Sequence, residues 1–103
     1  MQGLMAVLDL LKLKTFQVVA ATTNFTRAAA KLGYSQSSVT THIQALEREL
    51  GVPLFKRVSR KAVLTDAGQR ALEYANRLLA LAEEAKAAVQ KARRSEDRTT
   101  CQD

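Results

Sequence analysis

Residues 24–51, NFTRAAAKLGYSQSSVTTHIQALERELG, decide the fold of this chain. Asn24 or Thr26 can cap a short helix, because the side-chain oxygen accepts a hydrogen bond from a backbone N–H of the first turn. Gly33 can take the left-handed conformation that often follows a helix C-terminus. Ser35 is then placed to cap a second helix, which continues to the next glycine. The stretch therefore predicts two helices joined by a tight turn.

Small and apolar residues predict how these two helices meet. In a helix-turn-helix the two helices cross steeply, so their contact admits only a small residue. Ala29 supplies it, Gly33 makes the turn, and Val39 packs back from the second helix. We favour a helix-turn-helix over an ordinary helical corner because these positions are in register. The other buried positions expected in the motif are Ala28, Leu32 and Tyr34.

The helix over residues 35–50 has one apolar and one polar face. Its apolar residues are spaced four, three and four apart and form a stripe expected to face inward: Val39, Ile43, Leu46 and Leu50. The opposite face is uncharged: Gln36, Ser37, Thr40, Thr41 and Gln44. Gln can pair with the edge of adenine, and Ser or Thr can touch a thymine methyl group. We predict a recognition helix in the major groove; tolerated surface residues are the alternative.

The flanking sequence completes a small domain. Apolar residues at helical spacing predict a preceding helix over Leu8–Thr23. Two apolar segments flank a basic centre in residues 54–64, which we interpret as two brief strands joined by a tight turn. Thr65 then caps a long helix. The expected divisions are an extension over residues 1–7, a winged helix-turn-helix domain over 8–65, a linker helix over 66–92 and a frayed polar tail over 93–103.

Charge separates the two parts of the chain. The net charge is +6, and residues 1–65 account for all of it, with nine Lys/Arg against three Asp/Glu; residues 66–103 carry seven of each sign. Four cations lie in the expected wing: Lys56, Arg57, Arg60 and Lys61. A one-sided positive field suits a polyanion. A membrane surface would require the cations on an amphipathic helix, so nucleic acid is the favoured partner.

The long helix carries an apolar seam. Six residues follow a spacing of 4, 3, 4, 3, 4: Ala71, Ala75, Leu78, Ala82, Ala85 and Val89. We expect only the turns from Ala67 to Leu72 to pack on their own chain, because the domain is too small to cover the whole stripe. A second copy would cover the rest and relate two recognition helices by a two-fold axis, as an interrupted inverted repeat in DNA requires.

Several motifs together resemble a known family. They are NFTRAA (24–29), YSQS (34–37), LERELGVPLF (46–55) and LTDAG (64–68), with Leu32 and Arg57. They resemble the N-terminal domain of LysR-type transcriptional regulators over about Leu8 to Val89. The resemblance implies a mainly α fold: a winged helix-turn-helix of three helices and a short two-stranded wing, followed by a long dimerisation helix. It also implies a larger effector-binding domain that would normally follow. We therefore expect a fragment that meets a small-molecule effector only through that missing domain, with a higher oligomer as an option for the full-length protein.

The resemblance assigns roles to individual residues. The base-reading positions of the family fall on Gln36, Ser37, Thr40 and Thr41. The basic wing spans residues 56–62, with its tip at Arg60. Contacts to the DNA backbone or minor groove are expected at Thr26, Ser35, Ser38, Arg57, Arg60 and Lys61. Many relatives have Pro at position 37 and Arg at position 41, so Thr41 implies the loss of one guanine or phosphate contact.

The sequence gives no sign of catalysis or of a cofactor. His42 is the only histidine and Cys101 the only cysteine, and neither has partners at metal-ligand spacing. His42 could face the groove, face a phosphate or be partly buried. We expect a cytoplasmic, non-enzymatic homodimer that binds double-stranded DNA without metal, cofactor or membrane. A protein-interaction module and an architectural protein without sequence preference are the alternative hypotheses.

Overall fold

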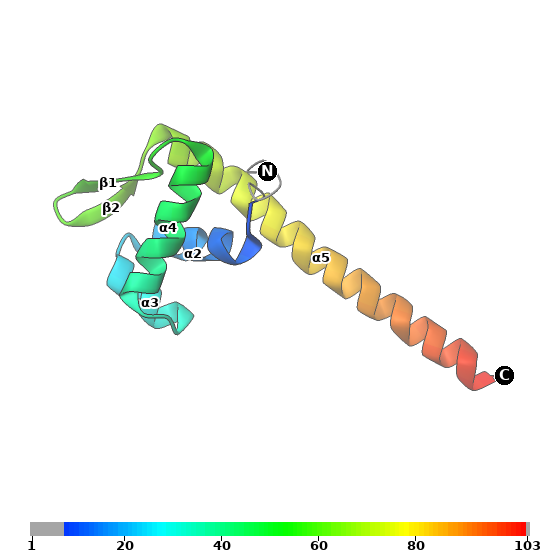
Figure 1. Ribbon diagram of the computed structural model, residues 1–103. Coiled ribbons are helices and arrows are strands. Elements are labelled where there is room, and N and C mark those ends of the chain that lie inside the picture. The colour runs from blue at the N-terminus through cyan, green and yellow to red at the C-terminus, as the bar shows by residue number, and fades with distance from the viewer. Residues whose placement is uncertain (1–7, 103) are drawn as a thin grey trace.

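Three helices form a small body, from which a two-stranded wing and one long helix project at opposite ends (Figure 1). The computed structural model describes residues 8–102, and the side chains of residues 8–95. The predicted extension over residues 1–7 lies outside the described residues. The elements in chain order are α2 (Leu10–Thr22), α3 (Phe25–Leu32), α4 (Gln36–Leu50), β1 (Phe55–Val58), β2 (Lys61–Leu64) and α5 (Asp66–Gln102). The expected mainly α winged helix-turn-helix is confirmed.

α2 begins two residues later than predicted, at Leu10 instead of Leu8, because Asp9 caps it. Asp9 Oδ1 accepts a hydrogen bond from the Leu11 backbone N–H at 2.8 Å. This hydrogen bond lowers the pKa of the Asp9 carboxyl, and the charge of Lys12 adds to the effect. A carboxylate at this place also interacts favourably with the positive end of the helix.

Caps fix the ends of the two motif helices. Of the two residues considered for the start of α3, Asn24 is the cap, and its Oδ1 accepts a hydrogen bond in the first turn at 2.9 Å. Ser35 caps α4, as predicted, with its Oγ 3.1 Å from a first-turn N–H. Gly33 and Gly51 end α3 and α4 with φ of +73°, a conformation that side chains other than glycine rarely adopt.

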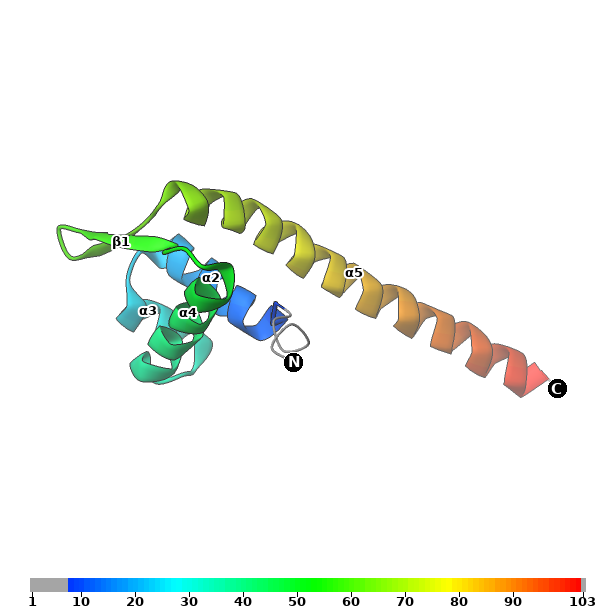
Figure 2. The ribbon, with the colours of Figure 1, turned by 45° about the horizontal axis from the view of Figure 1, so that its top comes forward.

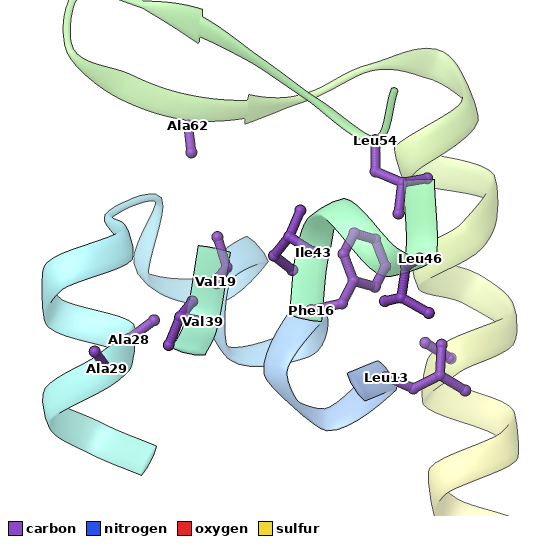
Figure 3. Packing of buried hydrophobic residues seen from close by; sticks show 11 residues of the cluster. Leu13, Phe16, Val19, Ala28, Ala29, Val39, Ile43, Leu46, Leu54 and Ala62 are labelled. Carbon is purple, nitrogen blue, oxygen red and sulfur yellow. The ribbon is translucent and has the colours of Figure 1, made fainter. Parts of the chain in front are cut away.

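The core lies where α2, α3 and α4 meet beneath the wing and the first turns of α5 (Figure 3). Ala28, Ala29 and Val39 are all buried, which agrees with the predicted helix contact. Leu32 and Tyr34 are half-buried against this core. The buried apolar residues are Leu13, Phe16, Val19, Ala28, Ala29, Val39, Ile43, Leu46, Leu54, Ala62 and Ala75.

Leu50 does not belong to this core, and its predicted burial is wrong. Its side chain is 43% exposed, whereas Val39, Ile43 and Leu46 are buried. The last turn of α4 reaches the edge of the body, where Leu50 lines an apolar hollow together with Leu8, Leu13, Ala71, Tyr74, Ala75 and Leu78. The stripe therefore faces inward over three of its four residues.

The wing is an antiparallel hairpin, as predicted. Phe55 pairs with Leu64 at its base, and Val58 pairs with Lys61 at its tip. Between them, Ser59 and Arg60 both have positive φ, of 50° and 69°. A two-residue turn with positive φ at both positions matches the right-handed twist of the two strands.

An aromatic contact and a backbone hydrogen bond help to attach the wing to the body. The Phe55 ring packs edge-on against Phe16, with 5.4 Å between the ring centroids. The Ala62 backbone N–H donates to the Thr23 carbonyl oxygen at 3.0 Å, so that β2 is tied to the turn between α2 and α3. The wing is therefore held in a fixed place beside the helix-turn-helix.

α5 is longer than predicted. It runs from Asp66 to Gln102, whereas we expected the helix to end at residue 92 and a frayed tail to follow. Residues 93–102 contain no Gly or Pro, and polarity alone does not end a helix. The helix also packs on its own chain further than the expected Ala67–Leu72, because Ala75 is fully buried. Ala75 is thus removed from the surface that a second copy could cover.

The start of α5 lies unusually close to the loop before the wing. Thr65 Oγ1 accepts a hydrogen bond from the Gly68 N–H at 3.0 Å and donates to the Pro53 carbonyl oxygen at 2.7 Å. A Cβ built on Gly68 would overlap the carbonyl oxygen of Leu54. Only glycine allows this approach.

Gly68→Ala should therefore lower the free energy of unfolding by about 3 kcal/mol, because the backbone must move apart. Gly33→Ala is the matched control: its Cβ would meet open space, and only the positive φ costs about 1 kcal/mol. Urea unfolding followed by circular dichroism measures both. A Gly68→Ala variant that loses no more stability than Gly33→Ala would contradict the close approach.

Candidate nucleic-acid interface

The polar face of α4 is open. Gln36, Ser37, Thr41 and Gln44 are exposed, and Thr40 is half-buried. The first turns of α4 lie at the surface beside α3, on the side of the body from which the wing projects (Figure 2). Of the four side chains predicted to contact bases, three are thus exposed and Thr40 is partly accessible; Gln44 lies about one turn beyond Thr40 on the same polar face.

A polar hollow of about 120 Å³ joins the starts of α3 and α4 to the wing. It brings together residues that are far apart in sequence. Two predicted polar residues, Thr26 and Gln36, lie on one side, and two predicted wing cations, Arg57 and Arg60, on the other. The complete lining is Thr23, Asn24, Phe25, Thr26, Gln36, Arg57, Arg60 and Ala62.

A second hollow, of about 180 Å³, lies further along α4, also against the wing. Thr40 and Gln44 face Lys56 and Arg57 across it. The complete lining is Phe25, Thr40, Ile43, Gln44, Glu47, Phe55, Lys56, Arg57 and Ala62. Ser35, Ser37, Ser38, Thr41 and Lys61 line neither hollow, although all five are exposed.

Arg57 is positioned by an aromatic ring. Its Cζ lies 5.8 Å from the centroid of Phe25, over the ring face, and Phe25 in turn packs edge-on against Phe55 at 6.0 Å. A cation over a ring face is attracted by the ring quadrupole. Arg57 is exposed and lines both hollows, so this ring contact favours a position of the guanidinium between them.

Hydrogen bonds among the serines at the start of α4 limit what each can donate. The Ser35 hydroxyl donates to Ser38 Oγ at 3.0 Å and accepts from the Ser38 N–H at 3.1 Å. A hydroxyl has one proton, so the Ser35 proton is already used. Ser38 keeps its own proton and is the better donor for an external acceptor.

Glu47 has a role that sequence analysis missed. Its Oε2 accepts hydrogen bonds from the backbone N–H groups of Leu54 at 2.8 Å and Phe55 at 3.4 Å. The side chain is half-buried and joins α4 to the start of β1. The available signal was its spacing of four from buried Ile43, which places Glu47 at the edge of the apolar stripe.

His42 packs inside the motif, which settles the alternatives that the sequence left open. Its Nδ1 lies 2.8 Å from the hydroxyl of the fully buried Thr15, and its ring meets Tyr34 edge-on at 5.5 Å. His42 thus joins α4 to α2. Within the described residues, no group of three His, Cys, Asp or Glu side chains could hold a metal ion.

The outer part of α5 exposes much of the predicted seam. Leu78 is 37% and Val89 68% exposed, and Ala85 is also exposed. Ala71 and Ala82 are half-buried. None of the helices among the described residues is both long and apolar enough to span a membrane.

Comparison with known proteins identifies a family. Residues 10–69 match the family described as bacterial regulatory helix-turn-helix proteins of the lysR family. An uncharacterized HTH-type transcriptional regulator of Bacillus subtilis, YwqM, is 45% identical over 86 residues, which are 84% of this chain and 29% of that relative. The HTH-type transcriptional regulator BudR of Klebsiella aerogenes is 44% identical over 84% of this chain and 58% of its own length. The chain thus spans less than a third of the first relative and less than two thirds of the second.

The fold is also similar to solved structures. In a crystal structure of a complex between the CbnR DBD and DNA, the protein is 40% identical and superimposes with a TM-score of 0.78. The match covers 82% of this chain and 98% of that one. About four fifths of this chain therefore corresponds to a protein whose structure was solved with DNA.

Glu47→Ala should loosen the base of the wing, because two backbone N–H groups lose their acceptor. We expect a loss of about 2 kcal/mol in stability and faster hydrogen exchange at the Leu54 and Phe55 amides. Glu49→Ala removes an exposed carboxylate two residues away and is the matched control. Equal exchange rates in both variants would show that the Glu47 contact does not hold the wing.

Proposed function

The chain belongs to the LysR family of bacterial regulatory helix-turn-helix proteins, and on this premise we propose that it is the DNA-binding part of a transcriptional regulator. It binds double-stranded DNA sequence-specifically, with α4 in the major groove and the wing on the backbone or in the adjacent minor groove. The protein acts in the cytoplasm, where a bacterial chromosome lies, and needs no cofactor for this binding. Catalysis has no part in the proposal.

The open face of α4 beside the basic wing carries this proposal. The first three turns of α4 have no acidic residue, and the first acid of the helix, Glu47, is turned to the wing backbone. Short polar side chains let the helix approach base edges closely. The wing cations supply the contacts to phosphate that position the helix without reading sequence.

The position of each side chain on α4 or on the wing suggests how the contacts divide. Gln36, Ser37, Thr40 and Thr41 are proposed to contact bases, because they lie on the outward face of α4. Arg57, Arg60 and Lys61 are proposed to contact phosphates or the minor groove, where arginine is favoured by a narrow, electronegative groove. Ser38 is proposed as a phosphate donor, and the Ser35 hydroxyl as a cap rather than a donor.

The chain is proposed to form a homodimer through the outer part of α5, so that the second copy binds the second half-site of the DNA. The accessible part of the seam consists of Leu78, Ala85 and Val89, which are exposed, and Ala82, which is half-buried; Ala75 is left out because it is fully buried. A two-fold axis along this seam would present two copies of α4 to an interrupted inverted repeat. Effector response and any higher oligomer would belong to the further domain that such regulators carry.

Selection from random double-stranded DNA tests the proposal as a whole. We expect an enriched inverted repeat, bound at least a thousandfold more tightly than competitor DNA at the same salt concentration. Enrichment without any preferred sequence would instead favour an architectural protein. Failure to retain DNA would favour a protein-interaction module.

Arg60→Ala tests the wing contact. The logarithm of the affinity falls linearly with the logarithm of the salt concentration, and each phosphate contact makes this slope steeper by about 0.9. The loss of Arg60 should therefore make the slope shallower by about 1 per protomer. Arg94→Ala removes the same charge from the far part of α5 and should leave the slope unchanged. Fluorescence anisotropy at several salt concentrations measures both. An identical slope in Arg60→Ala and the unsubstituted protein would exclude a phosphate contact at the wing tip.

Val89→Asp tests the dimer seam. Val89 is 68% exposed, so a charge there leaves the body of the protomer intact but would be buried in the proposed interface. We expect monomers by light scattering and at least a tenfold loss of affinity for the inverted repeat. Ala87→Asp adds the same charge on the opposite side of the helix and should remain dimeric. Dimers in both variants would refute the seam.

A further inference from the structure

Thr26 and Gln36 belong to different helices but are joined by a hydrogen bond. Thr26 lies in the first turn of α3, and Gln36 is the first residue of α4. The Thr26 hydroxyl donates to Gln36 Oε1 at 2.8 Å. Both side chains are exposed and line the polar hollow that faces Arg57 and Arg60. The contact thus lies on the surface proposed to meet DNA, and not in the core.

In this hydrogen bond the Gln36 amide has its oxygen toward Thr26 and its nitrogen away from it. A glutamine amide has an acceptor oxygen at one end and two N–H donors at the other, and rotation of the amide exchanges them. With Oε1 turned to Thr26, both donors on Nε2 remain for a partner outside the chain, whereas one of the two lone pairs of Oε1 is already engaged. The single hydroxyl proton of Thr26 is used in the same contact. Thr26 is therefore not free to donate to phosphate, which is the role that sequence analysis gave it.

The major-groove edges of the bases differ in the group that such a donor would meet. Guanine presents the acceptors N7 and O6 and thymine the acceptor O4, whereas adenine presents the donor N6 beside its acceptor N7, and cytosine presents the donor N4. The pairing of Gln with adenine, considered from the sequence, uses both ends of the amide. In this structure the acceptor end is directed to Thr26. A donor-presenting Gln36 fits the keto bases best.

We propose that Thr26 is a positioning residue that fixes the Gln36 amide as a donor, so that Gln36 selects the keto oxygen of guanine or thymine over the amino group of adenine or cytosine. This inference rests on the proposed function, because it requires α4 in the major groove. It adds a specificity determinant on α3, outside the recognition helix.

The test begins with the site selected by the unsubstituted protein. The selection is repeated with the Gln36→Ala variant. The base pair read by Gln36 is the position at which this variant no longer prefers the base that the unsubstituted protein selects. Two modified forms of that pair are then made: one lacks the keto oxygen of guanine or thymine, and the other lacks the amino group of its complement. A dissociation constant is measured for each modified site. The ratio of the two constants reports which group Gln36 contacts, and it depends neither on the overall affinity nor on which DNA strand carries the keto base.

For the unsubstituted protein we expect removal of the keto oxygen to weaken binding about fivefold more than removal of the amino group. Thr26→Ser keeps the hydroxyl and should keep this ratio. Thr26→Val keeps the shape but frees the amide to turn, so the ratio should fall to about one. A larger loss from removing the amino group, or an unchanged ratio in Thr26→Val, would overturn the inference while specific binding persists. Absence of any selected site would instead refute the proposed function, and this inference with it.

Discussion

The burial of one side of α4 is the constraint on which the remaining structure depends. Val39, Ile43 and Leu46 are each at most 3% exposed, and they pack with Phe16 and Val19 of α2. Burying a side chain of this size is worth about 1.5–3 kcal/mol, so turning α4 by half a turn would lose most of the stability expected for a small domain. The rotation of α4 about its axis is thereby fixed. Its polar face must lie outside, whatever that face binds.

The position of the wing follows from the same core. Phe16, which packs beneath α4, also meets Phe55 of β1 edge-on, and Phe55 meets Phe25, the ring beneath the Arg57 guanidinium. A continuous chain of rings therefore connects the centre of the domain to a cation of the candidate interface. Glu47 adds a polar link from α4 to the start of β1. Because the recognition helix and the wing share these supports, their spacing is a property of the core and not of a flexible loop.

Local signals explain how much of this could be predicted. The caps at Ser35 and Gly33, the hairpin and the inward stripe each depend on a few neighbouring residues, and sequence analysis found them. Leu50 and Ala75 were assigned wrongly because their burial depends on where other elements end: the body stops short of Leu50, yet it reaches Ala75. The contacts of Thr26 and Glu47 escaped notice for a related reason. Each joins two elements, and the sequence around a polar side chain does not show which distant backbone or side-chain group will lie beside it.

The attachment of α5 bears most directly on how two copies could meet DNA. Next to the buried Ala75, the Gln17 side chain donates to Asn76 Oδ1 at 2.8 Å, so α2 holds about the first three turns of α5. The helix then continues without Gly or Pro to Gln102, and no break in it could act as a hinge. A second copy packed on the exposed part of α5 would inherit this direction. The separation of two α4 helices would then be set by a rigid helix and its anchored first turns, so that changes at the Gln17–Asn76 contact would alter the spacing of half-sites and not the bases read within each.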